Sequence, residues 1–174
     1  NHRYGHFWSG GLGWNILNED FMAAWIDRID LFKLRASMGY TGKVSFSPFQ
    51  AMTMYQYENT YEYKNGIGAV PVTIGNIDLT WERTMNYNIG LDFSMFGRRL
   101  NVVVDAYLRN TTDLLLDKSK APSTGVTTAT SNLGEMQNKG LEFQVDGYIF
   151  RNKDFFWKLG TMGYLNRNKI TKIN

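Results

Sequence analysis

The chain has 174 residues, of which 15% are aromatic, including ten Tyr and five Trp, and it contains no Cys. Its formal net charge is only +3 and no basic run exceeds two residues, so the composition argues against a nucleic-acid-binding protein. The absence of Cys excludes disulfide and thiolate chemistry within these residues. No apolar run approaches the roughly 18 residues of a transmembrane helix.

The first thirty residues predict a strand followed by a helix. A Gly-rich strand is expected over residues 4–16. Asn18 is of a type that often caps helices, acidic residues follow it, and apolar side chains between Phe21 and Ile29 recur every three or four positions. This pattern predicts one short amphipathic helix of about three turns.

Five later segments alternate apolar and polar side chains with a period of two. Between Leu100 and Leu108, for example, every even position is apolar, whereas the odd positions include Asn101 and Asp105. Such alternation is typical of a strand with one apolar and one wet face. Stretches of about 9–11 residues of this kind match a tilted strand that crosses a bilayer. The predicted strands are residues 31–41, 81–96, 100–111, 136–150 and 155–166.

The connections between these segments alternate in length. Short turns are predicted at residues 97–99 and 151–154, and long loops at 43–78 and 114–135. This alternation is typical of outer-membrane barrels, in which short turns face the periplasm and longer loops face outward. On that assignment, the predicted helix also lies on the periplasmic side.

Several stretches, in this order, resemble the SusC/RagA family of TonB-linked outer-membrane proteins. They are Gly13-Trp14 with the 19–21 helix start, followed by residues 34–42, 76–84, 87–92, 105–107, 111–115 and 132–142. The resemblance covers essentially the whole chain and falls in the C-terminal part of the family's barrel. Residues 1–174 are therefore expected to be part of one barrel domain, without counterparts of the family's plug domain or TonB box.

The resemblance implies an all-β fold, a segment of a large antiparallel transmembrane barrel of about 22 strands when complete and plugged. It implies a multi-pass protein in the outer membrane, in contact with its lipid, of a Gram-negative bacterium of the Bacteroidetes type. The complete protein would import oligosaccharides or peptides, with a SusD-like surface lipoprotein as partner. Energy would come from the TonB complex acting through the plug region. No cofactor and no enzymatic activity are implied.

Two other classes of function stay open on the sequence. The first is a TonB-dependent receptor for siderophores or cobalamin, or a passive porin, whose barrel strands would look similar. The second is a soluble all-β carbohydrate-binding or adhesion module. That second alternative predicts that the apolar faces of the strands pack together into an internal core.

Residues that could perform chemistry are few. His2 and His6 would share a strand face but would lie about 13 Å apart, too far for one metal ion to bridge. No nucleophile, base and acid stand at suggestive spacings, so neither a catalytic, a metal nor a cofactor site is predicted.

The candidate contact residues are four tyrosines of the first long loop, which all occupy odd positions: Tyr55, Tyr57, Tyr61 and Tyr63. If this loop is extended, they line one face and form an aromatic platform for a solute or for the partner lipoprotein. The alternative is a strand that rises above the membrane, with tyrosines in the interfacial belt or packed on neighbouring loops.

Charged side chains gather on the predicted wet faces: Lys33, Arg35, Asp92, Asp105, Glu142 and Asp146. Charged residues at such positions commonly pair across neighbouring strands. Contact with a plug or a solute is the functional alternative.

Overall fold

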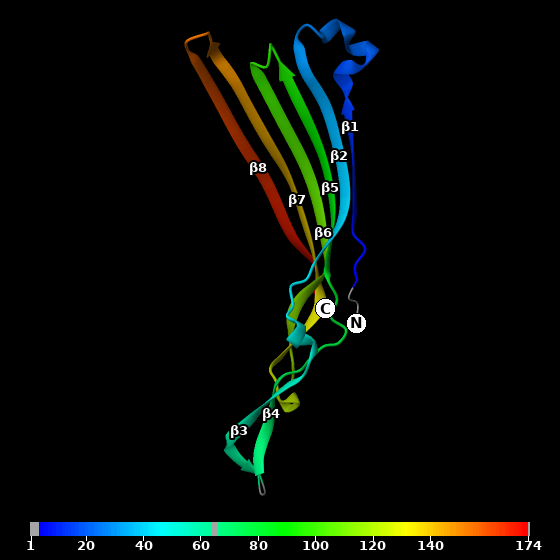
Figure 1. Cartoon of the computed structure of the whole chain (residues 1–174), viewed down its shortest axis with the longest axis vertical. Coiled ribbons are helices and arrows are strands. Elements are labelled where there is room, and N and C mark those ends of the chain that lie inside the picture. The colour runs from blue at the N-terminus through cyan, green and yellow to red at the C-terminus, as the bar shows by residue number, and fades with distance from the viewer. Residues whose placement is uncertain (1–3, 64–65, 174) are drawn as a thin grey trace.

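A six-stranded antiparallel sheet forms most of the computed structural model, which describes residues 4–63 and 66–173. The strands lie in the order β1-β2-β5-β6-β7-β8 (Figure 1). Their bounds are β1 Trp8–Asn15, β2 Ile29–Lys43, β5 Glu82–Met95, β6 Leu100–Ser119, β7 Thr128–Arg151 and β8 Phe156–Ile173. Between β2 and β5 the chain forms a separate two-stranded hairpin of β3 (Met54–Tyr63) and β4 (Gly66–Thr73). All five strands predicted from period-two alternation are confirmed.

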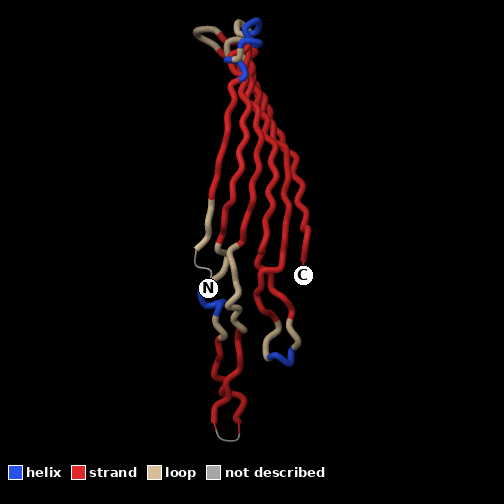
Figure 2. Tube along the Cα trace, turned by 90° about the vertical axis from the view of Figure 1, so that its right-hand side faces the viewer, coloured by secondary structure: helices blue, strands red, loops and turns tan. Residues whose placement is uncertain are grey.

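Within the described part of the chain, the six-stranded sheet is a single layer with no second layer packed on it (Figure 2). Leu12 and Leu165 on one face are 82% and 70% exposed, and Met162 on the other is 81% exposed. In the described part of the chain, the buried apolar residues are a few near the strand ends, such as Ile16 and Leu79. The soluble module predicted an internal core between apolar faces, and this prediction is wrong.

Short and long connections lie at opposite ends of the sheet. One end carries the turns after β5 and β7 and two short 3₁₀ helices, η1 (Ile16–Asn18) and η2 (Asp20–Trp25). The other end carries the β3–β4 hairpin, η3 (Pro48–Ala51) and η4 (Pro122–Thr124) (Figure 2). The predicted alternation of connections therefore holds. In the described residues, no helix is both long and apolar enough to span a bilayer.

The helical region is shorter than the sequence predicts. The expected three-turn helix is replaced by η1 and η2, and Asn18 is the last residue of η1 rather than a cap. Glu19 precedes η2 in an extended conformation, with φ −84° and ψ 144°, and it makes no side-chain cap. Ile29 already belongs to β2, opposite Met95. The apolar positions of this region have no core to pack on, since Phe21 and Trp25 are 66% and 53% exposed.

Both predicted long loops contain strands. Residues 43–78 hold the β3–β4 hairpin, and most of 114–135 pairs directly, because β6 continues to Ser119 and β7 begins at Thr128. The sheet pairing shifts register between Thr111 and Leu115, where Asp113 has a φ of +58°. The irregularity breaks the period-two pattern, which explains why this extension reads as a loop in the sequence.

Candidate functional site

The four candidate tyrosines all lie on β3, in the hairpin beyond the end of the six-stranded sheet (Figure 1). Tyr55 and Tyr57 are 67% and 77% exposed, and they lie opposite Pro71 and Ala69 in an unbroken stretch of pairing. Alternation places this pair on one face of the hairpin.

The second pair of tyrosines lies beyond an irregularity. The pairing shifts register between Glu58 and Glu62, so the alternation that starts at Tyr55 does not continue unbroken to Tyr61 and Tyr63. Tyr63 pairs with Gly66 along the backbone, whereas the side chains of Tyr61 and Tyr63 lie outside the described residues. A platform of four tyrosines stays a prediction, and the described residues contain its first half.

The base of the hairpin is tied to the extension of β6 and β7 by two asparagines. Asn132 on β7 donates from Nδ2 to the carbonyl oxygens of Thr80 and Asp113, at 3.0 and 2.7 Å, and accepts from the Thr80 amide at 2.9 Å. Asn76 donates to the Thr130 carbonyl at 3.2 Å. We call these contacts of Asn76 and Asn132 the asparagine clamp.

Three more contacts join the segments around the asparagine clamp. Gly125 has a φ of +84° and lies so close to the hairpin that a Cβ on it would be 2.7 Å from Cγ of Pro71. The Leu115 amide donates to Oε1 of Glu82 at 3.3 Å, while the Ser45 hydroxyl donates to Oε2 at 3.1 Å. Gly125 thus lies against the hairpin, and Glu82 joins the segment after β2 to the extension of β6.

The asparagine clamp was not predicted from the sequence. Asn76, Thr80 and Asn132 all lie in stretches that carry the family resemblance, 52 to 56 residues apart in the chain. Each stretch reads separately as a loop or a strand start. The pairing of β5 with β6 and of β6 with β7 brings them together.

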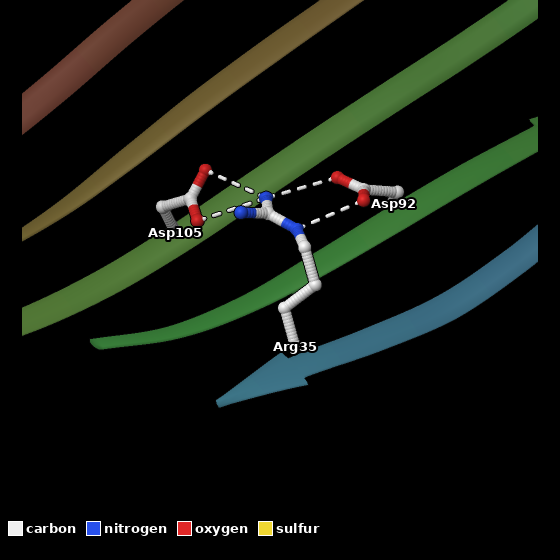
Figure 3. A network of polar contacts seen from close by, with 3 residues as sticks. All are labelled: Arg35, Asp92 and Asp105. Atoms are coloured by element: carbon white, nitrogen blue, oxygen red, sulfur yellow. Dashed lines mark hydrogen bonds and ion pairs between the residues drawn. The ribbon is translucent and has the colours of Figure 1, made fainter. Parts of the chain in front are cut away.

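The wet face of the sheet carries an ion-pair cluster centred on Arg35 of β2. Its guanidinium lies 2.8 Å from Oδ2 of Asp92 on β5, and its Nη2 donates to Oδ1 of Asp105 on β6 at 3.0 Å (Figure 3). Cross-strand pairing of the wet-face charges is thereby confirmed for these three residues. The side chains are 40%, 23% and 36% exposed, so water screens the pairs and each contributes little to stability.

A glycine makes the Arg35 cluster possible. Gly90 lies directly between Arg35 and Asp105 in the register of β2, β5 and β6. A Cβ at Gly90 would come 2.7 Å from Nη2 of Arg35 and would also collide with Asp105. Because Gly90 has no side chain, the side chain of Arg35 can cross β5 and reach Asp105.

Two further carboxylates lie on the same face. Asp146 on β7 pairs with Lys158 on β8 at 2.9 Å and accepts from Asn101 on β6 at 3.1 Å. Glu142 lies directly opposite Asp105 and is exposed. Arg35, Asp105 and Glu142 thus form a row of charged side chains across this face of the sheet.

The opposite face is apolar along the same rows. Leu34, Leu91, Val104 and Phe143 lie side by side across β2, β5, β6 and β7. Aromatic residues occur towards both ends, with Tyr40 beside Phe7 at one end and Phe150 stacked on Trp157 at the other. A one-layer antiparallel sheet with one apolar face, one charged face and aromatic residues near its ends is the wall of a transmembrane barrel.

Comparison with known proteins identifies the kind of barrel. A family model described as TonB dependent receptor-like, beta-barrel, matches residues 1–172. The chain is 36% identical to TonB-dependent receptor P39 of Formosa agariphila, over 99% of the chain and 16% of that protein. It is 32% identical to TonB-dependent receptor SusC of Bacteroides thetaiotaomicron, over 99% of the chain and 18% of that protein.

A solved structure agrees with these sequence relatives. The structure of the RagAB peptide importer in its closed-closed state is similar, with a TM-score of 0.83 and 29% identity over 96% of this chain and 18% of that one. The chain therefore belongs to the TonB-dependent receptor β-barrel family and is of the SusC/RagA type. It spans less than a fifth of the length of these relatives.

Proposed function

We propose that this chain is part of the barrel wall of an outer-membrane importer that takes up oligosaccharides or peptides together with a SusD-like surface lipoprotein. The single observation that carries the proposal is the two-faced sheet in a chain of the SusC/RagA type. Its apolar face suits lipid, and its charged face suits a lumen occupied by a plug and a passing solute. TonB would supply the energy through the plug region.

The β3–β4 hairpin is proposed to work at the entrance. We place it outside the cell because it belongs to the long connection between β2 and β5, and long connections of outer-membrane barrels face outward. Tyr55 and Tyr57 each offer a flat apolar ring and a hydroxyl, which suits both sugar stacking and protein interfaces. Ring side chains also lose little rotamer freedom on binding. The asparagine clamp fixes the base of the hairpin, so these rings are held at a defined place near the mouth of the barrel.

Deletion of the full-length gene in its own organism tests the proposal. The deletion strain should lose growth on one class of polymer, either an oligosaccharide or a peptide mixture, and should regain it with the full-length gene. Affinity purification of the tagged full-length protein should retain a surface lipoprotein. Undiminished growth on every oligosaccharide and peptide source, with no lipoprotein retained, would contradict the proposal.

The tyrosines can be tested separately from the barrel. The variant Tyr55→Ala with Tyr57→Ala, and the fourfold variant that adds Tyr61→Ala and Tyr63→Ala, should lower uptake or lipoprotein retention at normal abundance in the outer membrane. The matched control is Val72→Ala on β4, which removes an apolar side chain that is 50% exposed on the same hairpin. Unchanged uptake and retention in an abundant fourfold variant would refute the platform.

A further inference from the structure

The apolar face of the sheet ends abruptly in positive charge on β7 and β8. Leu141 and Leu165 are directly opposite each other on this face, and the next pair on the same face is Lys139 with Arg167. Lys169 follows two residues after Arg167. We call Lys139, Arg167 and Lys169 the cationic edge. It lies on the half of the strands nearer the β3–β4 hairpin.

The cationic edge belongs to the face that contacts lipid, not to the lumen. Pairing between β7 and β8 is unbroken from Met136 to Tyr148, so alternation is continuous through this region. Glu142 lies opposite Asp105 on the face of the Arg35 cluster. Lys139 is three residues from Glu142 and therefore points to the other face.

Among the described residues, no ion pair joins any of the three cations to an acid. Glu135, at a position of the same face on β7, is 4.0 Å from Lys172 instead. Arg83 holds the corresponding place on β5, just beyond the apolar residues of this face. Unlike the three cations it is paired with an acid, Asp113, at 3.2 Å. All three side chains of the cationic edge are exposed.

Like charges directly opposite one another on neighbouring strands destabilise a sheet. Lys139 and Arg167 are such a pair, and Lys169 adds a third charge about 7 Å along the strand. An anion held between them would remove this repulsion, and phosphate is well suited because its oxygens accept several charge-assisted hydrogen bonds at once. The exposed Leu141, Phe143 and Leu165 continue from the charges as an apolar surface.

We propose that the cationic edge binds the phosphate groups of a phosphorylated membrane lipid, whose acyl chains lie on Leu141, Phe143 and Leu165. The combination of charges and a continuous apolar surface fits a lipid rather than a free phosphate ion. The proposal rests on the outer-membrane location proposed above, and it places this lipid in the leaflet on the side of the β3–β4 hairpin.

The test uses the purified full-length protein in detergent with diphosphoryl lipid A as the probe, and counts bound lipid by native mass spectrometry. The variant Lys139→Gln, Arg167→Gln, Lys169→Gln should bind the lipid at least about tenfold more weakly than the parent protein. The charge-preserving variant Lys139→Arg, Arg167→Lys, Lys169→Arg should retain binding. Lipid A from which both phosphates have been removed should bind as weakly to the parent protein as diphosphoryl lipid A does to the Gln variant.

A control removes the same charge elsewhere. The variant Lys118→Gln, Lys120→Gln, Lys153→Gln loses three exposed cations, two at or just after the far end of β6 beyond the register shift and one in the turn after β7, and its lipid binding should equal that of the parent. If the threefold Gln variant at the cationic edge does not fold, Arg167→Gln alone serves, with a smaller loss expected. Folding is checked by the heat-dependent shift of the barrel on gels.

Three results would overturn the proposal. They are undiminished lipid binding in a folded variant of the cationic edge, equal binding of dephosphorylated lipid A, and full displacement of the lipid by excess inorganic phosphate. Because the readout is bound lipid and not uptake, failure of the import proposal in the deletion strain would leave this result standing, and the reverse also holds.

Discussion

Replacing Val104 with Arg should destabilise the barrel far more than the same replacement at Val103, its neighbour on β6. Val104 lies on the apolar face between Leu91 and Phe143. Val103 lies on the charged face, between Asp92 and Gln144. Both residues are half-buried valines, so the two positions differ chiefly in the face of the sheet on which the side chain lies.

The expected magnitude follows from position. The apolar face of β6 runs from Leu100 to Leu108, and Val104 is its midpoint. Eight steps of about 3.4 Å give roughly 27 Å of strand, which a tilt of about 40° reduces to a height of about 21 Å, within the barrel's apolar band of about 25 Å. An Arg near the midplane costs about 2–4 kcal/mol. At Val103 the new cation faces Asp92, and the cost should be below about 1 kcal/mol.

The assay is urea unfolding of the full-length protein in bilayers, followed by the mobility shift of the folded barrel on gels. A difference of about 2–3 kcal/mol between the variants corresponds to a roughly 30- to 150-fold change in the ratio of folded to unfolded protein. Asp105 is unsuitable as the control position, because an Arg there would also break the ion pair with Arg35. Equal destabilisation at Val103 and Val104 would refute the assignment of the two faces.

Two further predictions concern the clamp and the topology. Asn132→Ala removes both the acceptor of the Thr80 amide and the donor to the Thr80 carbonyl, so amide hydrogen exchange at Thr80 should become faster. Asn168→Ala, at an exposed residue of β8, should leave that exchange unchanged, and equal exchange in both variants would show that the clamp does not hold the hairpin. In intact cells, a membrane-impermeant thiol reagent should label Ser123→Cys and not Arg98→Cys, both of which replace exposed residues, and the opposite labelling would reverse the orientation.

Period-two alternation was sufficient to predict the five long strands of the sheet because each of them has one apolar and one polar face. Leu100 to Leu108 follows the pattern without interruption, and β6 forms there with the expected faces. The pattern fails from Asp113 onward, where a register shift and three consecutive leucines hide the continuation of the strand. The long loop predicted from residue 114 is for this reason mostly strand.

Helix prediction failed for a different reason. Apolar residues between Phe21 and Ile29 have helical spacing, but such spacing stabilises a helix only where an apolar stripe can pack on something. Trp25 stays half exposed at the end of the sheet, and pairing of Ile29 with Met95 draws the chain into β2.

The polar sites depended on register, which one sequence does not reveal. Arg35 could be assigned to the wet face, yet its contact with Asp105 requires that Gly90 lie between them. The asparagine clamp likewise requires Thr80 and Asn132 to meet across 52 residues of chain. That Tyr55 and Tyr57 share one face could be predicted, because a common face follows from local alternation alone.

The central claim is that one face of the sheet contacts lipid and the other faces the lumen. A nitroxide scan of residues 100–108 in the full-length protein in bilayers tests this most directly, and this segment contains no cysteine of its own. Even positions should be accessible to oxygen, which concentrates in lipid, and odd positions to a polar nickel chelate. Accessibility without a period of two, or with the two probes exchanged, would contradict the account.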